Sequence, residues 1–80
     1  MTKQEFINWA KDRGYTQDKF GHLQKTLGSD YIRLKLSSTA VRYERQIIFS
    51  DGKHEWVRIY SGYFSKLSIN SKNQLVGLKR

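Results

Sequence analysis

Hydrophobic and polar residues alternate in two segments of the chain, and this alternation is the most informative pattern in the sequence. At the period of two that a strand imposes, residues 56–60 put Trp56, Arg58 and Tyr60 on one face and two aliphatic residues on the other. Residues 31–36 alternate in the same way. Each segment therefore offers aromatic rings and positive charge on the face opposite its aliphatic residues.

The first residues of the chain carry helix signals. Thr2 and Glu5 have the spacing of a capping box, in which each side chain accepts a hydrogen bond from the other residue's backbone amide. One helical face then collects the apolar residues Phe6, Ile7 and Ala10. Gly14 is a typical left-handed stop. These signals predict a helix over about residues 3–13.

Residues 15–27 fit two structures. Their apolar spacing and a possible Thr16 cap allow a second helix, and with it a reading that resembles a helix-turn-helix, but Gly21 disfavours a helix interior. We favour a strand over residues 22–27, because Gly28-Ser29 can turn the chain back into residues 31–36. Leu27 then pairs with Asp30 or with Ile32. Either register gathers one set of apolar residues on a single face: Leu23, Leu27, Ile32, Leu34 and Leu36.

A second hairpin is predicted around Ser50-Asp51-Gly52, between strands over residues 41–49 and 53–60. A three-residue loop with Gly52 in the left-handed position of a bulge gives the better register. The expected cross-strand pairs are Tyr43 with Ile59, Glu44 with Arg58, Gln46 with Trp56, and Arg42 with Tyr60. Arg45 is left on the apolar face, near its edge.

The remaining residues complete a single domain. Ser61-Gly62 predicts a bend, Leu67 and Ile69 a short strand, and residues 71–73 a turn into residues 75–78. We therefore expect an α+β fold over residues 1–80, with one N-terminal helix packed on an antiparallel β-meander of about five or six strands.

The charge of the chain indicates the class of partner that it binds. The chain has 15 Lys and Arg against seven Asp and Glu, a net charge of +8, and most of the excess follows residue 30. A lopsided positive field attracts polyanions. No segment resembles a signal peptide or a membrane span, and there is no cysteine. We expect a cytoplasmic protein that does not bind membranes.

Catalytic and metal-binding signatures are missing. His22 and His54 are the only histidines, and their spacing does not suit a metal site. The serines, carboxylates and glycines form no triad, acid–base pair or phosphate-binding loop. We expect a protein that is not an enzyme and uses no cofactor or metal.

The predicted binding surface is the aromatic and basic face of the sheet. Rings that stack on bases and cations that neutralise phosphates suit single-stranded DNA or RNA. An acidic protein docking on the same face is the alternative. Packing offers another explanation, in which Trp56 lies beneath the helix against Phe6 or Trp9 and the cations form a solvated edge. The candidate nucleic-acid-binding residues are Tyr31, Arg33, Lys35, Arg42, Trp56, Arg58 and Tyr60.

Four short runs resemble small uncharacterised proteins encoded by phages and prophages of Gram-positive bacteria: residues 31–35, 41–44, 55–58 and 61–64. The resemblance spans most of the chain. It implies an accessory protein made in the host cytoplasm during infection or lysogeny, acting on nucleic acid or inhibiting a host protein. It assigns no activity, cofactor or residue role.

Overall fold

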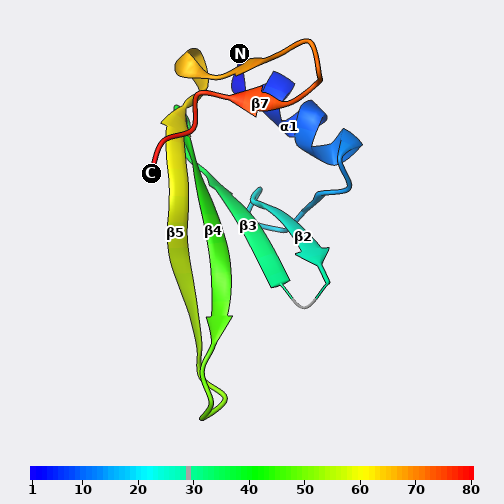
Figure 1. Cartoon of the computed structure of the whole chain (residues 1–80). Coiled ribbons are helices and arrows are strands. Elements are labelled where there is room, and N and C mark those ends of the chain that lie inside the picture. The colour runs from blue at the N-terminus through cyan, green and yellow to red at the C-terminus, as the bar shows by residue number, and fades with distance from the viewer. Residues whose placement is uncertain (29) are drawn as a thin grey trace.

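The computed structural model describes residues 1–28 and 30–80 and has the predicted α+β fold (Figure 1). Helix α1 (Lys3–Asp12) precedes a five-stranded antiparallel sheet in the order β1-β2-β3-β4-β5. A 3-10 turn, η1 (Phe64–Lys66), leads to a separate two-stranded sheet. The strands are β1 (Thr16–Gln17), β2 (Leu23–Leu27), β3 (Asp30–Leu36), β4 (Ala40–Ile48), β5 (His54–Tyr63), β6 (Ser68–Ile69) and β7 (Leu75–Val76).

Helix α1 begins as the sequence predicts. The Thr2 side chain accepts from the Glu5 amide at 3.1 Å, and the Glu5 carboxylate accepts from the Thr2 amide at 2.8 Å, which completes the capping box. The helix ends at Asp12, one residue before the predicted end, and Gly14 follows with φ +91°. Its buried face is the predicted one: Phe6, Ile7 and Ala10.

The segment before β2 is a turn, so the helical alternative for residues 15–27 is wrong. The Asp18 carboxylate accepts from the backbone amides of Phe20 and His22, and Gly21 has φ +86°, which helical residues do not adopt. Leu27 pairs with Asp30, the first of the two predicted registers. Ser29, half of the predicted turn, lies outside the described residues.

The register of β4 and β5 is as predicted near the turn and wrong beyond it. Glu44 opposite Arg58 and Gln46 opposite Trp56 are confirmed. Between Glu44 and Tyr43 the register shifts by one residue, so Tyr43 faces Tyr60 instead of Ile59. Ile59 is the extra residue of this bulge, which turns the strand beyond it to the opposite face. The predicted bend at Ser61-Gly62 is also wrong, because β5 continues to Tyr63.

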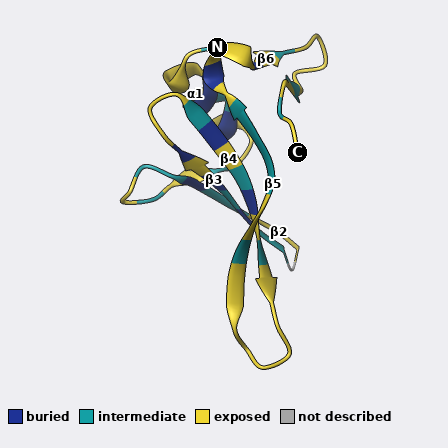
Figure 2. Ribbon diagram, turned by 90° about the vertical axis from the view of Figure 1, so that its left-hand side faces the viewer, coloured by how far each residue is buried: buried dark blue, intermediate teal, exposed yellow. Residues whose placement is uncertain are grey.

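The core lies between α1, one face of the sheet and η1. Its buried residues are Phe6, Ile7, Ala10, Leu23, Leu34, Leu36, Val41, Phe64 and Leu67. Figure 2 shows that this burial is confined to one half of the molecule. The outer part of the β4–β5 hairpin projects beyond β2 and β3 as an exposed arm, which contributes to dimensions of 41 × 26 × 23 Å.

The C-terminal segment returns to the sheet. Strands β6 and β7 pair as the predicted short hairpin, with Asn73 at φ +61° in the turn. Ser61 and Lys79 then exchange two backbone hydrogen bonds of 2.7 and 2.9 Å, which place the last residues beside β5. Within the described part of the chain, no helix has the length and apolar character needed to cross a membrane.

Candidate nucleic-acid interface

Six of the seven predicted site residues share the sheet face that points away from α1. The alternation of β3, β4 and β5 and their observed register place them there: Tyr31, Arg33, Lys35, Arg42, Trp56 and Arg58. Tyr60 does not share this face. Because of the bulge, it lies opposite Tyr43 on the α1 side, with the two ring centroids 5.9 Å apart. The predicted pair of Arg42 with Tyr60 is replaced by Arg42 with Ser61.

Trp56 is half-buried on the open face, so its proposed position beneath α1 is wrong. The Arg33 guanidinium carbon lies 4.2 Å from the Trp56 ring centroid, and the Tyr31 ring lies 5.6 Å away. This spacing is typical of a cation–π contact. The Tyr31 hydroxyl donates to the Gln24 side chain. Arg33 therefore occupies one approach to the indole ring.

The charge of Arg33 is balanced inside the same cluster. Its Nη2 and Nε atoms lie 2.8 and 2.9 Å from Oε1 of Glu44, whose residue is 5% exposed. Glu44 Oε2 lies 4.0 Å from Arg42 Nη1. We call Tyr31, Arg33, Glu44 and Trp56 the Trp56 cluster. Its members contact one another through stacked rings, a cation–π contact and an ion pair. The cluster therefore forms a small second packing centre on the open face.

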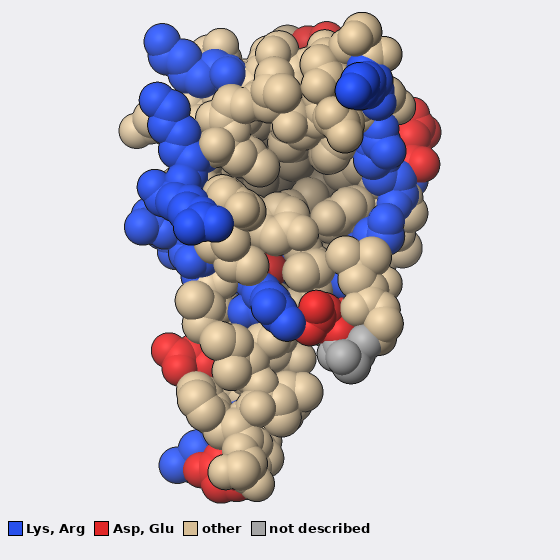
Figure 3. All heavy atoms as spheres, viewed as in Figure 1, with Lys and Arg blue, Asp and Glu red and all other residues tan. Residues whose placement is uncertain are grey.

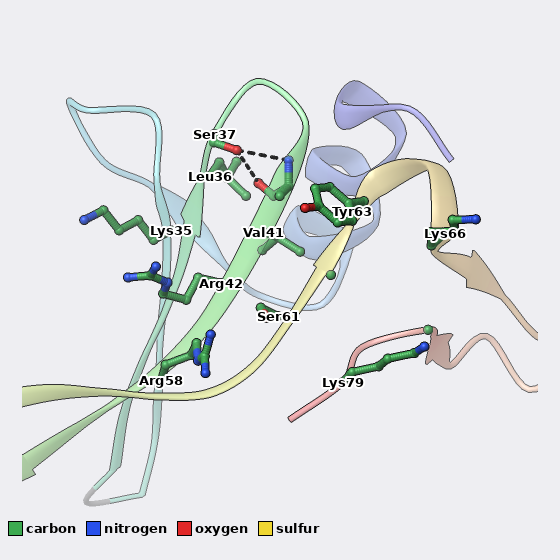
Figure 4. A pocket seen from close by; sticks show the side chains of 13 residues that line it. Lys35, Leu36, Ser37, Val41, Arg42, Arg58, Ser61, Tyr63, Lys66 and Lys79 are labelled. Carbon is green, nitrogen blue, oxygen red and sulfur yellow. Dashed lines mark hydrogen bonds between the residues drawn. The ribbon is translucent and has the colours of Figure 1, made fainter.

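Three exposed cations stand beside this cluster, and we call Lys35, Arg42 and Arg58 the basic row. In Figure 4 they project side by side from β3, β4 and β5. Lys35 and Arg42 are directly opposite partners in the sheet. Like charges in such positions repel and destabilise a sheet, typically by a few tenths of a kcal/mol to about 1 kcal/mol. Glu44 offsets only part of this repulsion, because one of its oxygens lies 4.0 Å from Arg42 and the other is paired with Arg33.

A groove of about 840 Å³ runs along the basic row. Two further cations line it, Lys66 from η1 and Lys79 from the C-terminal segment, and none of its described lining residues is acidic. The Ser61 and Lys79 backbone pairing is what holds Lys79 there. Neither lysine was predicted as a site residue. Their only signal in the sequence is their positive charge in a C-terminal half that is rich in positive charge.

Other chemistry is sparse among the described residues. They contain no group of three or more His, Cys, Asp and Glu side chains placed to hold a metal ion. His22 has a structural contact instead, because its Nδ1 accepts from the Leu36 amide at 3.0 Å. Arg45, which the sequence left on the apolar face, forms an ion pair of 2.7 Å with Asp30 at the start of β3.

Comparison of the chain with protein-family models, with curated proteins and with solved structures finds no match in any of the three. The resemblance to phage-encoded proteins stays a prediction.

Proposed function

We propose that the protein binds nucleic acid, with the sugar-phosphate backbone lying along the basic row and the groove beside it. The observation that carries this proposal is the like-charge pair of Lys35 and Arg42, extended by Arg58, in a groove with no acidic residue among its described lining residues. Lys66 and Lys79 supply further positive charge on the other wall. The negative charge of a strand of phosphates relieves this repulsion, and each neutralised phosphate also releases a condensed counterion, which favours binding at low salt.

The Trp56 cluster holds the strands that carry the basic row. Glu44 balances Arg33 and lies near Arg42, and the stacked rings fix the strands from which all three cations project. This assigns phosphate contacts to Lys35, Arg42 and Arg58, and a structural role to Tyr31 and Arg33. Trp56 then contributes to binding mainly by holding the sheet surface in shape.

Salt dependence tests the proposal. A labelled single-stranded oligonucleotide, DNA or RNA, is titrated at several salt concentrations by fluorescence anisotropy. Three to five neutralised phosphates give a slope of log K against log salt of about −2 to −3.5 for a single strand. Arg58→Gln should make this slope shallower by about 0.7. The absence of binding even at low salt overturns the proposal.

Lys53→Gln is the matched control. Lys53 has a side chain 83% exposed near the hairpin tip, so its replacement removes the same charge far along the arm. It should leave the slope nearly unchanged, whereas an equal effect of the two variants would mean that only net charge matters. An acidic protein that competes with the oligonucleotide for Arg58 would support the alternative partner.

A further inference from the structure

A second concavity lies on the opposite side of the sheet, beneath α1 and the C-terminal segment. This aromatic hollow has a volume of about 380 Å³, within the size range of small-ligand pockets. Figure 3 looks onto the face that contains it, where a depression lies between two flanks of basic side chains. Its aromatic lining residues are Phe6, Trp9, Tyr15, Tyr43 and Tyr60.

The rings of the hollow are half-buried, with Phe6 alone fully buried behind them. Burial, with the neighbouring Tyr43 hydroxyl, raises the pKa of Tyr15, so its hydroxyl stays protonated. Gln74 adds an amide at the wall, which can both donate and accept hydrogen bonds. The hollow therefore offers flat apolar surfaces together with a few neutral polar groups.

Cations stand over three of these rings. Arg13 lies 5.2 Å from the Trp9 ring centroid, and Lys25 lies 5.4 Å from that of Tyr15. Arg80 lies 5.8 Å from that of Tyr60. No acidic residue is among the described residues that line the hollow. A flat, π-rich interior with a positive rim is complementary to a planar ligand that carries negative charge at its edge.

We propose that the aromatic hollow holds one unstacked nucleobase, with the attached phosphate at its cationic rim. Bases stack favourably on protein aromatic rings whatever their identity, and Tyr and Gln side chains can bond to base edges. Because the base is taken to be part of a bound nucleic-acid strand, this inference rests on the proposed function. Tyr60, one of the aromatic residues that the sequence predicted to stack on bases, lies on this side of the sheet because of the bulge.

The hollow and the groove share a wall. Gln74, Leu75 and Leu78 line the hollow, while Gly77 and Lys79 of the same segment line the groove. Residues 74–79 therefore separate a base site from a phosphate site by the width of one extended segment. A single strand that crosses this segment can place phosphates on the basic row and one base in the hollow.

The test compares two single-stranded oligonucleotides of equal length, one normal and one abasic at every position. The protein should bind the normal strand roughly 5- to 150-fold more tightly, the range expected for one stacked base. Tyr60→Leu should remove most of this difference, without changing the salt slope or the affinity for the abasic strand. Tyr60→Phe, which keeps the ring, should restore it. Phe20→Leu is the control, because Phe20 is 73% exposed and lies outside the hollow.

The outcomes separate the two proposals. Equal binding of both strands by the wild-type protein overturns the base site and leaves the phosphate site intact; so does a Tyr60→Leu effect no larger than that of Phe20→Leu. If neither strand binds, the proposed function fails, and uridine monophosphate becomes the probe. A shift of the Trp9 indole NMR signal with this nucleotide, but not with ribose 5-phosphate, then supports the hollow as a nucleotide site. No shift with either compound rejects it.

Discussion

Glu44→Gln separates the stability of the open face from its affinity for polyanions. Glu44 is the buried carboxylate of the Trp56 cluster, 2.8 Å from Arg33 and 4.0 Å from Arg42. Glutamine keeps the shape of the side chain and one acceptor oxygen but removes the negative charge. Arg33 is thereby left half-buried without its ion partner, and the positive potential beside the basic row rises.

The expected loss of stability follows from the burial of the pair. Breaking a fully buried ion pair by removing one partner costs about 3–5 kcal/mol. The Arg33 side chain is 24% exposed, and the glutamine retains an acceptor, so part of this cost is relieved by water and by the remaining hydrogen bond. We expect a loss of about 2 kcal/mol, which lowers the urea midpoint by about 2 M at an m-value near 1 kcal/mol/M.

Urea unfolding followed by tryptophan fluorescence measures this loss, and oligonucleotide titration at low salt measures binding. The control is Glu55→Gln, an equal charge change at an exposed residue of the arm, which should alter stability by less than about 0.5 kcal/mol. We expect Glu44→Gln to be the less stable variant and also the tighter binder. Equal midpoints for the two variants would refute the role of Glu44.

Three further predictions concern the fold. Thr2→Ala removes the capping box and should cost about 1 kcal/mol in unfolding free energy, measured by urea denaturation. Asp18 loses some hydration, which raises its pKa, but hydrogen bonds from two backbone amides and the Gln24 amide outweigh this, so the pKa is lowered from 3.8. Its stabilising contribution is therefore complete above that value and is lost as the pH falls through the lower folded pKa; Asp18→Asn should reduce the difference in urea midpoint between about pH 7 and about pH 3. Gly77→Ala would drive a Cβ into the Lys66 carbonyl at φ +110° and should destabilise by roughly 1–3 kcal/mol, more than Gly52→Ala, whose Cβ would meet open space.

Local pattern was enough to predict the β2–β3 hairpin and the part of the β4–β5 hairpin near its turn. The alternation in β2 and β3 allows only registers that bury Leu23 with Leu34, and the Gly52 turn fixes Glu44 opposite Arg58. The helix start was equally local, since its capping box needs only neighbouring residues. In these strands one face is apolar, and a shift of the register by one residue would expose it.

Two features of the site depend on contacts that the sequence does not display. The bulge at Ile59 lies between Arg58 and Tyr60, where neither glycine nor proline marks it. It transfers Tyr60 from the predicted face to the hollow. Lys79 enters the groove through a bridge to Ser61, a pairing between positions that local periodicity cannot connect.

A chemical-shift map of the protein titrated with a short single-stranded oligonucleotide at low salt tests the central claim most directly. We expect the largest changes at the side chains of Lys35, Arg42 and Arg58 and at the backbone around Ser61 and Lys79, with smaller changes along the hairpin arm. Changes confined to the arm, or a spectrum that does not respond, would contradict phosphate binding on the basic row.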